Sequence, residues 1–226
     1  MNIVAIILAI VVVLLFYILY SFFVVKSTEI TKSANLNATN PPIPIKNGSV
    51  STRYAYGIWI YVNSWNTSTV KTIFSRFNNI KLYLDSNAPI LKCDITMTGS
   101  STAKPIKTLE ITDNFPLQKW THIAVSVDNQ YVDAYLDGKL IKSGRMFDGT
   151  NGPASPDTSP MIIGGNPFDA YISKFQYWPE PIDPQTIWSE YMKGNGQSNV
   201  TNFMSSYGIN LSIIKDNIEQ SKYSLF

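Results

Sequence analysis

The single histidine of this 226-residue chain is the first candidate for acid–base chemistry. His122 lies in the segment WTHIAVSVDNQYVDAYLDGKL (residues 120–140), which also carries three aspartates. Imidazole has an unperturbed pKa near neutrality, so a histidine beside carboxylates can serve as a general base. A serine in a G-x-S-x-G turn would complete such a site, but the sequence has no such motif. Because apolar residues alternate around His122, we expect it to lie on one face of a β-strand, where it packs or forms a hydrogen bond.

Aromatic side chains are the second group with a chemical role to consider. Rings that share an exposed face of a sheet can stack on sugars, whereas buried rings only fill the core. The candidates at strand spacing are Trp65, Tyr83, Tyr131, Tyr135 and Phe168. The sequence does not show which of these rings are exposed. A binding surface formed by Trp65, Tyr131, Tyr135 and Phe168 is therefore a hypothesis, and a place in the core is the alternative.

Composition narrows the classes of function. Eighteen basic and sixteen acidic residues give a net charge of +2, which indicates no nucleic-acid partner. Cys93 is the only cysteine, so the chain can form neither an internal disulfide nor a thiolate zinc cluster. A hydrophobic content of 45% predicts a sizeable core and excludes a disordered chain. We expect no bound cofactor.

Alternation with a period of two residues dominates the chain from Arg53 onward. In RYAYGIWIYV both sets of alternate positions are apolar, which is typical of a strand covered on both faces. Ten strands are predicted: Arg53–Val62, Val70–Arg76, Ile80–Asp85, Ile90–Met97, Ile106–Thr112, Trp120–Asp128, Tyr131–Asp137, Lys139–Ser143, Met161–Gly164 and Ala170–Trp178. Short strands with no helix between them predict an all-β protein with an antiparallel sandwich or jelly roll.

Two local signals complete the prediction for this domain. Asp137-Gly138 suits the positive φ angles of a type I′ turn between two strands. Asp183 can cap a short helix that begins at Pro184 and stops at Gly194. The predicted apolar side of this helix consists of Ile187, Trp188 and Tyr191. We expect the helix to lie against an edge or end of the sandwich.

The N-terminal segment IVAIILAIVVVLLFYILYSFFVV (residues 3–25) contains no charged residue. As a helix with a rise of about 1.5 Å per residue, it is long enough for the roughly 30 Å core of a bilayer. We interpret residues 1–25 as one transmembrane anchor. A cleaved signal peptide is the alternative, but the apolar run is too long and no small-residue cleavage motif follows it. Lys26 and Lys32 after the run favour a cytosolic position for the body.

The segments on either side of the predicted domain differ from it in composition. Residues 26–52 are rich in Ser, Thr, Asn and Pro, which predicts a flexible linker. The domain itself then covers residues 53–196, and residues 197–226 form a C-terminal arm. In this arm Leu211, Ile214 and Ile218 follow a cap at Asn210, which predicts a short amphipathic helix. The arm can pack on its own domain or dock on a neighbouring subunit, and the sequence leaves both open.

Three blocks between about Arg53 and Lys193 resemble the concanavalin A-like, laminin G-like jelly-roll family. They are YGIWIYVNSW, the W-x-H-[apolar]-A-[apolar] strand with the hairpin YLDGKL, and IIGG followed by YISKFQYW and a short helix. The resemblance implies a two-sheet antiparallel sandwich. Across the family this fold mostly binds sugars, proteins or other surface ligands, and one branch cuts glycans.

The functional residues of that family do not transfer well to this chain. The glycan-cutting branch carries carboxylates at alternate positions of one strand, E-x-D-x-E, so that two of them flank the scissile bond. No such run is present here, and we expect no enzyme. Calcium sites of the family use loop oxygens, which Asp148, Asn151 and Asp157 could supply in the loop Phe147–Pro160. These residues are also ordinary turn formers, which is the alternative.

The sequence as a whole predicts a non-catalytic, membrane-anchored structural or interaction protein. A single jelly roll behind one N-terminal anchor is similar to minor structural proteins of large double-stranded DNA viruses. This resemblance implies a minor capsid or virion-membrane protein at the interface between internal membrane and capsid, with the lipid bilayer and neighbouring capsid proteins as partners. The alternative is a membrane-anchored, lectin-like module that binds glycans. A glycoside hydrolase is a distant third hypothesis.

Overall fold

The computed structural model describes residues 3–23, 27–45, 51–99, 104–196, 210–215 and 218–224, with the side chains of α1 described for residues 7–19. The helices are α1 (Ile3–Phe23) and α2 (Pro184–Met192). The strands are β1 (Thr28–Asn35), β2 (Arg53–Val62), β3 (Lys71–Arg76), β4 (Ile80–Leu84), β5 (Leu91–Thr96), β6 (Ile106–Thr112), β7 (Trp120–Asp128), β8 (Tyr131–Leu136), β9 (Lys139–Arg145), β10 (Met161–Ile163), β11 (Ala170–Trp178), β12 (Asn210–Lys215) and β13 (Ile218–Ser224).

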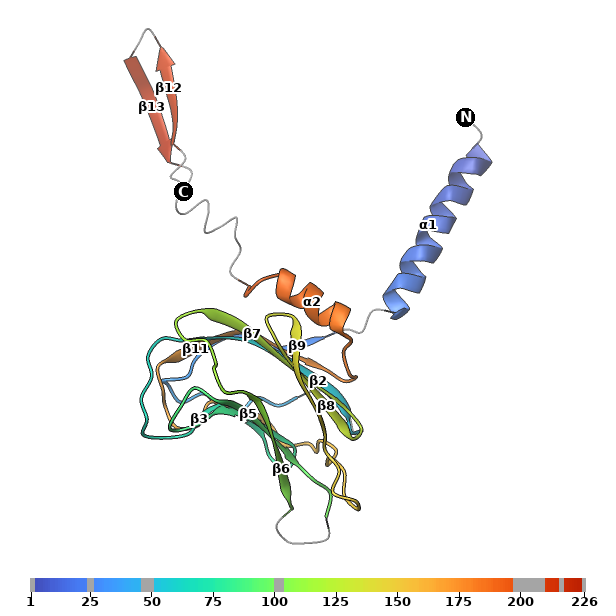
Figure 1. Ribbon diagram of the computed structural model, residues 1–226. Helices are drawn as coiled ribbons and strands as arrows, with labels where there is room; N and C mark the ends of the chain where they lie inside the picture. The colour runs from blue at the N-terminus through green and yellow to red at the C-terminus, as the bar shows by residue number, and fades with distance from the viewer. Residues whose placement is uncertain are drawn as a thin grey trace.

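The body of the molecule is a sandwich of two antiparallel sheets (Figure 1). The six-stranded sheet has the order β1-β11-β2-β7-β8-β9, and the five-stranded sheet has the order β10-β3-β4-β5-β6. The predicted all-β, two-sheet architecture is therefore confirmed. All ten predicted strands are present, and four of them have the predicted bounds, namely β2, β6, β7 and β11.

The alternation in β2 shows how the sequence produces the two layers. Tyr54, Tyr56 and Ile58 point into the core between the sheets, and they are at most 1% exposed. Tyr56 packs on Phe74 of the facing sheet, with ring centroids 5.3 Å apart. The other face of β2 points outward, and much of it is also buried because α2 covers it. A strand that is apolar on both faces was the prediction for this segment.

Helix α2 forms as predicted and lies on the outer face of the six-stranded sheet. Asp183 caps it by accepting hydrogen bonds from the backbone N–H groups of Gln185 (2.9 Å) and Thr186 (3.0 Å). Gly194 follows the helix with φ of 71°. Ile187 is buried with outward-facing residues of β2, β7 and β8. Trp188, predicted for the apolar side, is instead 44% exposed.

The predicted flexible linker is wrong for residues 28–36. Strand β1 pairs with β11, for example Thr28 with Tyr177 and Asn35 with Tyr171. Leu36 follows the strand and is 1% exposed in the core. The composition misled because β1 is an edge strand with largely exposed side chains, so backbone hydrogen bonds rather than apolar burial hold it. The sandwich consequently begins four residues after α1.

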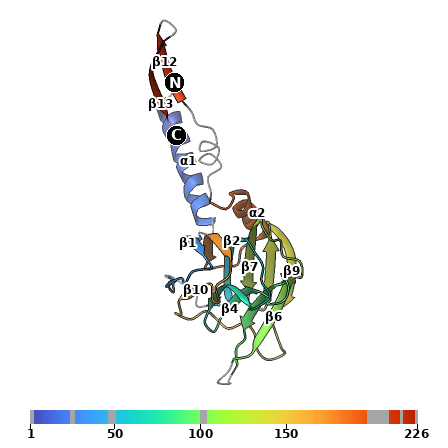
Figure 2. The same cartoon turned by 90° about the vertical axis from the view of Figure 1, so that its left-hand side faces the viewer.

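Helix α1 projects from the same side of the body that carries α2 (Figure 2). Its sequence, IVAIILAIVVVLLFYILYSFF, contains no charged residue. Over the residues whose side chains the structure describes, which in α1 are residues 7–19, no helix is long and apolar enough to cross a membrane.

The predicted amphipathic helix in the C-terminal arm is also wrong. Residues 210–215 and 218–224 form β12 and β13, which pair as an antiparallel two-stranded sheet. The segment contains Ile213 and Ile214 side by side. Such β-branched residues favour an extended backbone over a helix.

Candidate functional site

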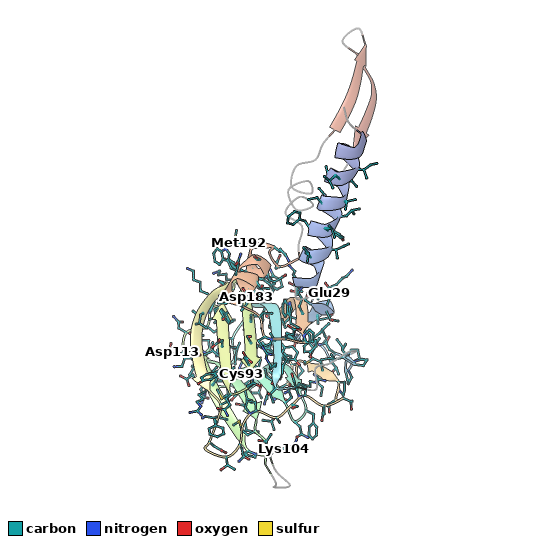
Figure 3. The ribbon with its side chains drawn as sticks, turned by 90° about the vertical axis from the view of Figure 1, so that its right-hand side faces the viewer. Glu29, Cys93, Lys104, Asp113, Asp183 and Met192 are labelled. Atoms are coloured by element: carbon teal, nitrogen blue, oxygen red, sulfur yellow. The ribbon has the colours of Figure 1, made fainter. Side chains whose placement is uncertain are left out.

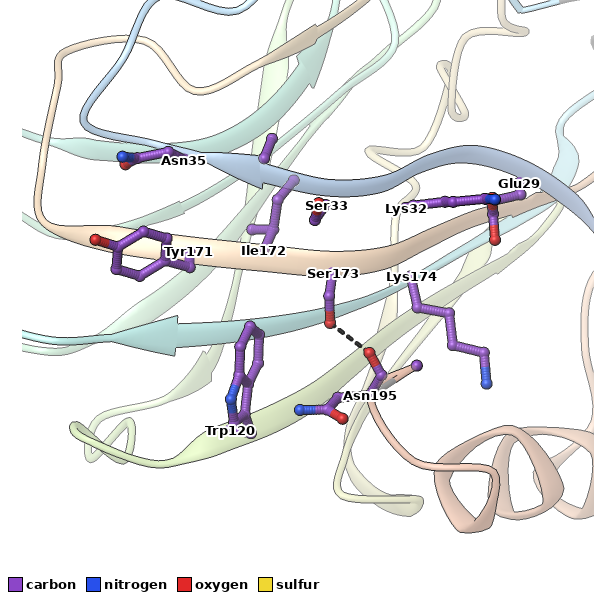
Figure 4. Close-up of a pocket in the computed structure, with 12 residues that line it drawn as sticks. Glu29, Lys32, Ser33, Asn35, Trp120, Tyr171, Ile172, Ser173, Lys174 and Asn195 are labelled. Carbon is purple, nitrogen blue, oxygen red and sulfur yellow. Dashed lines mark hydrogen bonds between the residues drawn. The ribbon is translucent and has the colours of Figure 1, made fainter. Parts of the chain in front are cut away.

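An open groove of about 900 Å³ lies on the outer face of the six-stranded sheet (Figure 4). Strands β1 and β11 form one side of it. The first residue of β7, Trp120, and the segment that follows α2, at Asn195 and Gly196, form the other side. The edge strand β1, its neighbour β11 and the segment after α2 therefore border a depression that is open to solvent.

A row of aromatic side chains crosses the sheet at one end of this groove. Tyr171 of β11 is directly opposite Tyr61 of β2, and Tyr61 is directly opposite Trp120 of β7. The rings of Tyr61 and Trp120 have centroids 5.7 Å apart. Tyr171 is 44% exposed, and the other two rings are half-buried. Because neighbouring strands are about 4.8 Å apart, the row extends roughly 10 Å across the strands.

Polar groups border the aromatic row. Asn35 of β1 pairs with Tyr171, and its Oδ1 accepts a hydrogen bond from the backbone N–H of Asn37 (2.9 Å). The Ser173 hydroxyl donates to the Asn195 carbonyl (2.7 Å), which fixes the segment after α2 to the sheet. Ser33 lines the groove between these groups. The groove thus combines flat rings with amide and hydroxyl groups that can exchange hydrogen bonds with a ligand.

The other end of the groove carries charge. A bulge in β11 gives Lys174 a φ of 49°, so that both Ser173 and Lys174 face the groove. Lys174 Nζ donates to the Gly194 carbonyl (3.3 Å) and lies 3.8 Å from Oε2 of Glu190 on α2. Burial lowers the pKa of Lys174, while the Glu190 carboxylate opposes this shift. Glu29 and Lys32 of β1 line the same end.

His122 lies beside the groove and beneath α2. It lies on a strand face and packs there, as predicted. Its backbone N–H donates to Oδ1 of Asp137 (2.9 Å). Its ring packs on Trp59, with centroids 5.2 Å apart, and Tyr191 of α2 stacks on Trp59 at 5.6 Å. Burial lowers the pKa of His122 to about 4, so the ring is neutral at pH 7. A 2% exposed, neutral histidine cannot reach a ligand in the groove.

The structure does not bring the predicted aromatic residues together. Phe168 and Tyr135 are each 2% exposed, the first in the core and the second under α2. Trp65 is half-buried against the core, with Lys71 Nζ 4.2 Å from its ring centroid. Tyr83 is in the other sheet and donates to Asp94 (3.2 Å). Only Tyr131 is well exposed, at 56%, and it lies outside the groove.

The predicted calcium ligands are used in turns of their own loop. Asp148 accepts hydrogen bonds from the backbone N–H groups of Asn151 (2.6 Å) and Thr150 (2.9 Å), which lower its pKa to about 2. Asp157 accepts one from Ser159 (2.8 Å). Among the residues that the structure describes, no group of three or more metal-binding side chains occurs. These observations favour the turn-forming alternative for this loop.

The aromatic row was missed because it depends on the order of strands in the sheet. Tyr61, Trp120 and Tyr171 each fall within a predicted strand. Alternation predicts that Tyr61 and Trp120 lie on the outer faces of their strands. It does not predict that β11 and β7 are the two neighbours of β2 in the sheet. That adjacency creates the row.

The fold is a two-sheet antiparallel β-sandwich with an open groove on one sheet face. A family model of the concanavalin A-like lectin/glucanase superfamily matches residues 37–190. The chain belongs to this superfamily. The match begins within the segment that composition had assigned to a linker, in agreement with the observed sandwich.

Relatives of known sequence or structure are distant. The SH2 domain-containing protein A of Arabidopsis thaliana is 23% identical over 152 residues, which cover 60% of this chain and 24% of that protein. The receptor-binding domain of botulinum neurotoxin D superposes with a TM-score of 0.56 at 14% identity, covering 74% of this chain and 45% of that chain. The binding domain of Paraclostridial Mosquitocidal Protein 1 gives a TM-score of 0.54 at 12% identity, covering 74% and 47%. The chain thus spans less than half the length of each relative.

Proposed function

We propose that this protein is a non-catalytic binding module that takes a glycan in the groove. The observation that carries the proposal is the row Tyr171, Tyr61 and Trp120 on an open sheet face. Flat aromatic rings stack on the apolar faces of sugars, and the neighbouring Asn35 and Ser33 supply polar groups for hydroxyls. A row about 10 Å long fits an oligosaccharide that lies across the strands.

Binding rather than hydrolysis agrees with the charges around the groove. Glycoside hydrolysis uses two carboxyl groups on opposite sides of the scissile bond. Glu29 is the one carboxylate among the described residues that line the groove. Glu190 is a buried residue of α2, and its carboxylate lies 3.8 Å from Nζ of Lys174 and 2.6 Å from Nζ of Lys193, so these ion pairs compensate its negative charge.

The related structures are compatible with this proposal but do not carry it. The ligand-binding domain of botulinum neurotoxin D has been solved in complex with N-acetylneuraminic acid, and it superposes on this chain with a TM-score of 0.57 at 14% identity. At that identity the likeness concerns the fold alone.

A glycan array with the full chain in detergent, followed by titration of the best ligand, tests the proposal. We expect Tyr171→Ala and Trp120→Ala each to weaken binding about two- to tenfold, the effect of one stacked ring. Tyr131→Ala is the matched control, because Tyr131 is also an exposed tyrosine of the six-stranded sheet, at 56% against 44% for Tyr171, but lies outside the groove. Equal affinity of all three variants, or no ligand on the array, would refute the assignment.

We further propose that α1 anchors the protein in a membrane. This rests on the sequence of Ile3–Phe23, whose 21 uncharged residues would form a helix about 31 Å long, close to the thickness of a bilayer core. Extraction of membranes with alkaline carbonate tests it. The chain should remain with the lipid, and its release would argue against the anchor.

A second candidate function is the structural role in a virion. It is favoured by the short connection between α1 and β1, because four residues keep the sandwich close to the bilayer, as a part joining a membrane to a protein shell requires. The proposed location is the interface of internal membrane and capsid. Crosslinking of intact particles, with identification of the partners, tests this role. Crosslinks to capsid proteins are expected, and their absence while the protein is present would reject it.

A further inference from the structure

An apolar surface remains uncovered on α2 and the neighbouring hairpin. Trp188 and Met192 stand one helical turn apart on α2 and are 44% and 65% exposed. Leu140 of β9 is 52% exposed, and it pairs with Tyr135, which lies under α2. Trp188 also approaches Gly138 in the turn between β8 and β9. We call Trp188, Met192 and Leu140 the α2 patch.

Lysines surround the α2 patch. Lys139 of β9 is exposed, Lys139 and Lys119 line one depression with Trp188, and the side chains of Lys119 and Lys193 are each 60% exposed. The last two pair with the carboxylates of Asp137 and Glu190 (2.8 Å and 2.6 Å). A tryptophan among apolar side chains, bordered by lysines, is the composition that proteins present to the headgroup layer of a bilayer.

The course of the chain puts this patch and α1 on one side of the molecule. Four residues separate Phe23 from Thr28, a connection of at most about 17 Å. Thr28 pairs with Tyr177 near the end of β11, and α2 begins shortly afterwards at Pro184. Both helices therefore join the same end of the six-stranded sheet. Figure 3 shows Met192 on the side from which α1 projects, and Lys104 at the opposite end.

We propose that the α2 patch rests in the headgroup region of the bilayer that α1 crosses. This inference depends on the membrane anchoring proposed above. Three apolar side chains would bind lipid weakly on their own, because stable attachment generally takes two signals. The short connection to α1 supplies the second signal by holding the patch at a high effective concentration near the lipid surface. The groove, on the same sheet face, then lies beside the headgroup layer.

Site-specific labelling of the full chain can test this contact. Met192→Cys is labelled with an environment-sensitive fluorophore and reconstituted into phosphatidylcholine and phosphatidylglycerol vesicles that contain doxyl-lipid quenchers. Native Cys93 is fully buried and does not compete for the label. Ile106→Cys is the matched control, because Ile106 is 63% exposed and lies two residues from Lys104, far from α1. Val13→Cys, in the middle of α1, reports on the anchor itself.

We expect the label at position 192 to shift its emission to the blue and to be quenched by shallow doxyl groups. The label at position 106 should show neither effect, and the label at position 13 should be quenched by deep doxyl groups. Quenching at 13 with none at 192 overturns the α2 contact while the anchor stands. Quenching at 192 with none at 13 supports the contact and overturns the anchor. No quenching at either position rejects both, and equal quenching at 192 and 106 rejects a specific contact.

Discussion

Replacing Gly138 by alanine tests how firmly α2 is held against the β8–β9 hairpin. Gly138 has a φ of 78°, and Asp137 before it has a φ of 47°, as the predicted type I′ turn requires. A Cβ at position 138 would lie 2.7 Å from Cε3 of Trp188 and 3.2 Å from Cβ of Tyr191. Alanine in this backbone conformation costs about 1–2 kcal/mol, and overpacking adds about 1–3 kcal/mol. We therefore expect Gly138→Ala to lower the free energy of unfolding by about 2–5 kcal/mol.

Gly194→Ala provides the control for the backbone term. Gly194 has a φ of 71°, and a Cβ there meets nothing within 4 Å, so only the cost of about 1–2 kcal/mol remains. Thermal unfolding of the detergent-solubilised chain, followed by near-UV circular dichroism, gives the comparison. The Tm of Gly138→Ala should lie lower by about 2–4 °C for each kcal/mol of difference. Equal Tm values would show that Trp188 and Tyr191 move away without cost, and would refute the tight contact.

Three further predictions concern single groups. Burial lowers the pKa of His122 from 6.5 to about 4 in the folded protein. As the pH falls, the imidazole of the unfolded chain is therefore protonated at a higher pH than the imidazole of the folded chain. The free energy of unfolding should therefore fall by about 3 kcal/mol as the pH drops from about 6.5 to about 4, and His122→Gln should remove this part of the pH dependence in denaturant titrations. Burial raises the pKa of the Cys93 thiol, so a thiol reagent should modify it only at the rate of unfolding, and rapid modification of folded protein would contradict the buried position. Asp183→Ala removes the cap of α2 and should cost about 1 kcal/mol of stability in the same titrations, whereas no loss would mean that α2 does not depend on its cap.

The sequence predicted those parts of the fold that depend on local pattern. The β2 segment alternates clearly, Asp137-Gly138 requires a particular turn, and Asp183 with Pro184 starts a helix, so each of these features is local. Strand β1 was missed because TEITKSAN carries little apolar periodicity and its pairing partner, β11, lies more than 130 residues further along the chain. Trp188 was expected to be buried from helical periodicity alone, which does not tell how far α2 is rotated on the sheet.

The sequence predicted a binding surface of aromatic side chains, but it did not predict which rings form that surface or where it lies. Aromatic stacking was a hypothesis from composition, yet the rings chosen, such as Phe168 and Tyr135, are buried. The rings that form the row belong to three strands whose adjacency arises from the tertiary fold. His122 is likewise neutral because it is buried under α2, and no neighbouring residue in the sequence indicates this burial.

The direct continuation of α1 into β1 also has a mechanical consequence. Strand β1 is joined to the body through its backbone ladder with β11, in register from Thr28 to Asn35 with one irregularity. A pull on the N-terminal helix along the strand axis would load the hydrogen bonds of this ladder in shear, so that many must break together rather than one after another. The edge strand, with few buried side chains of its own, would then act as the element that transmits tension between the helix and the sandwich.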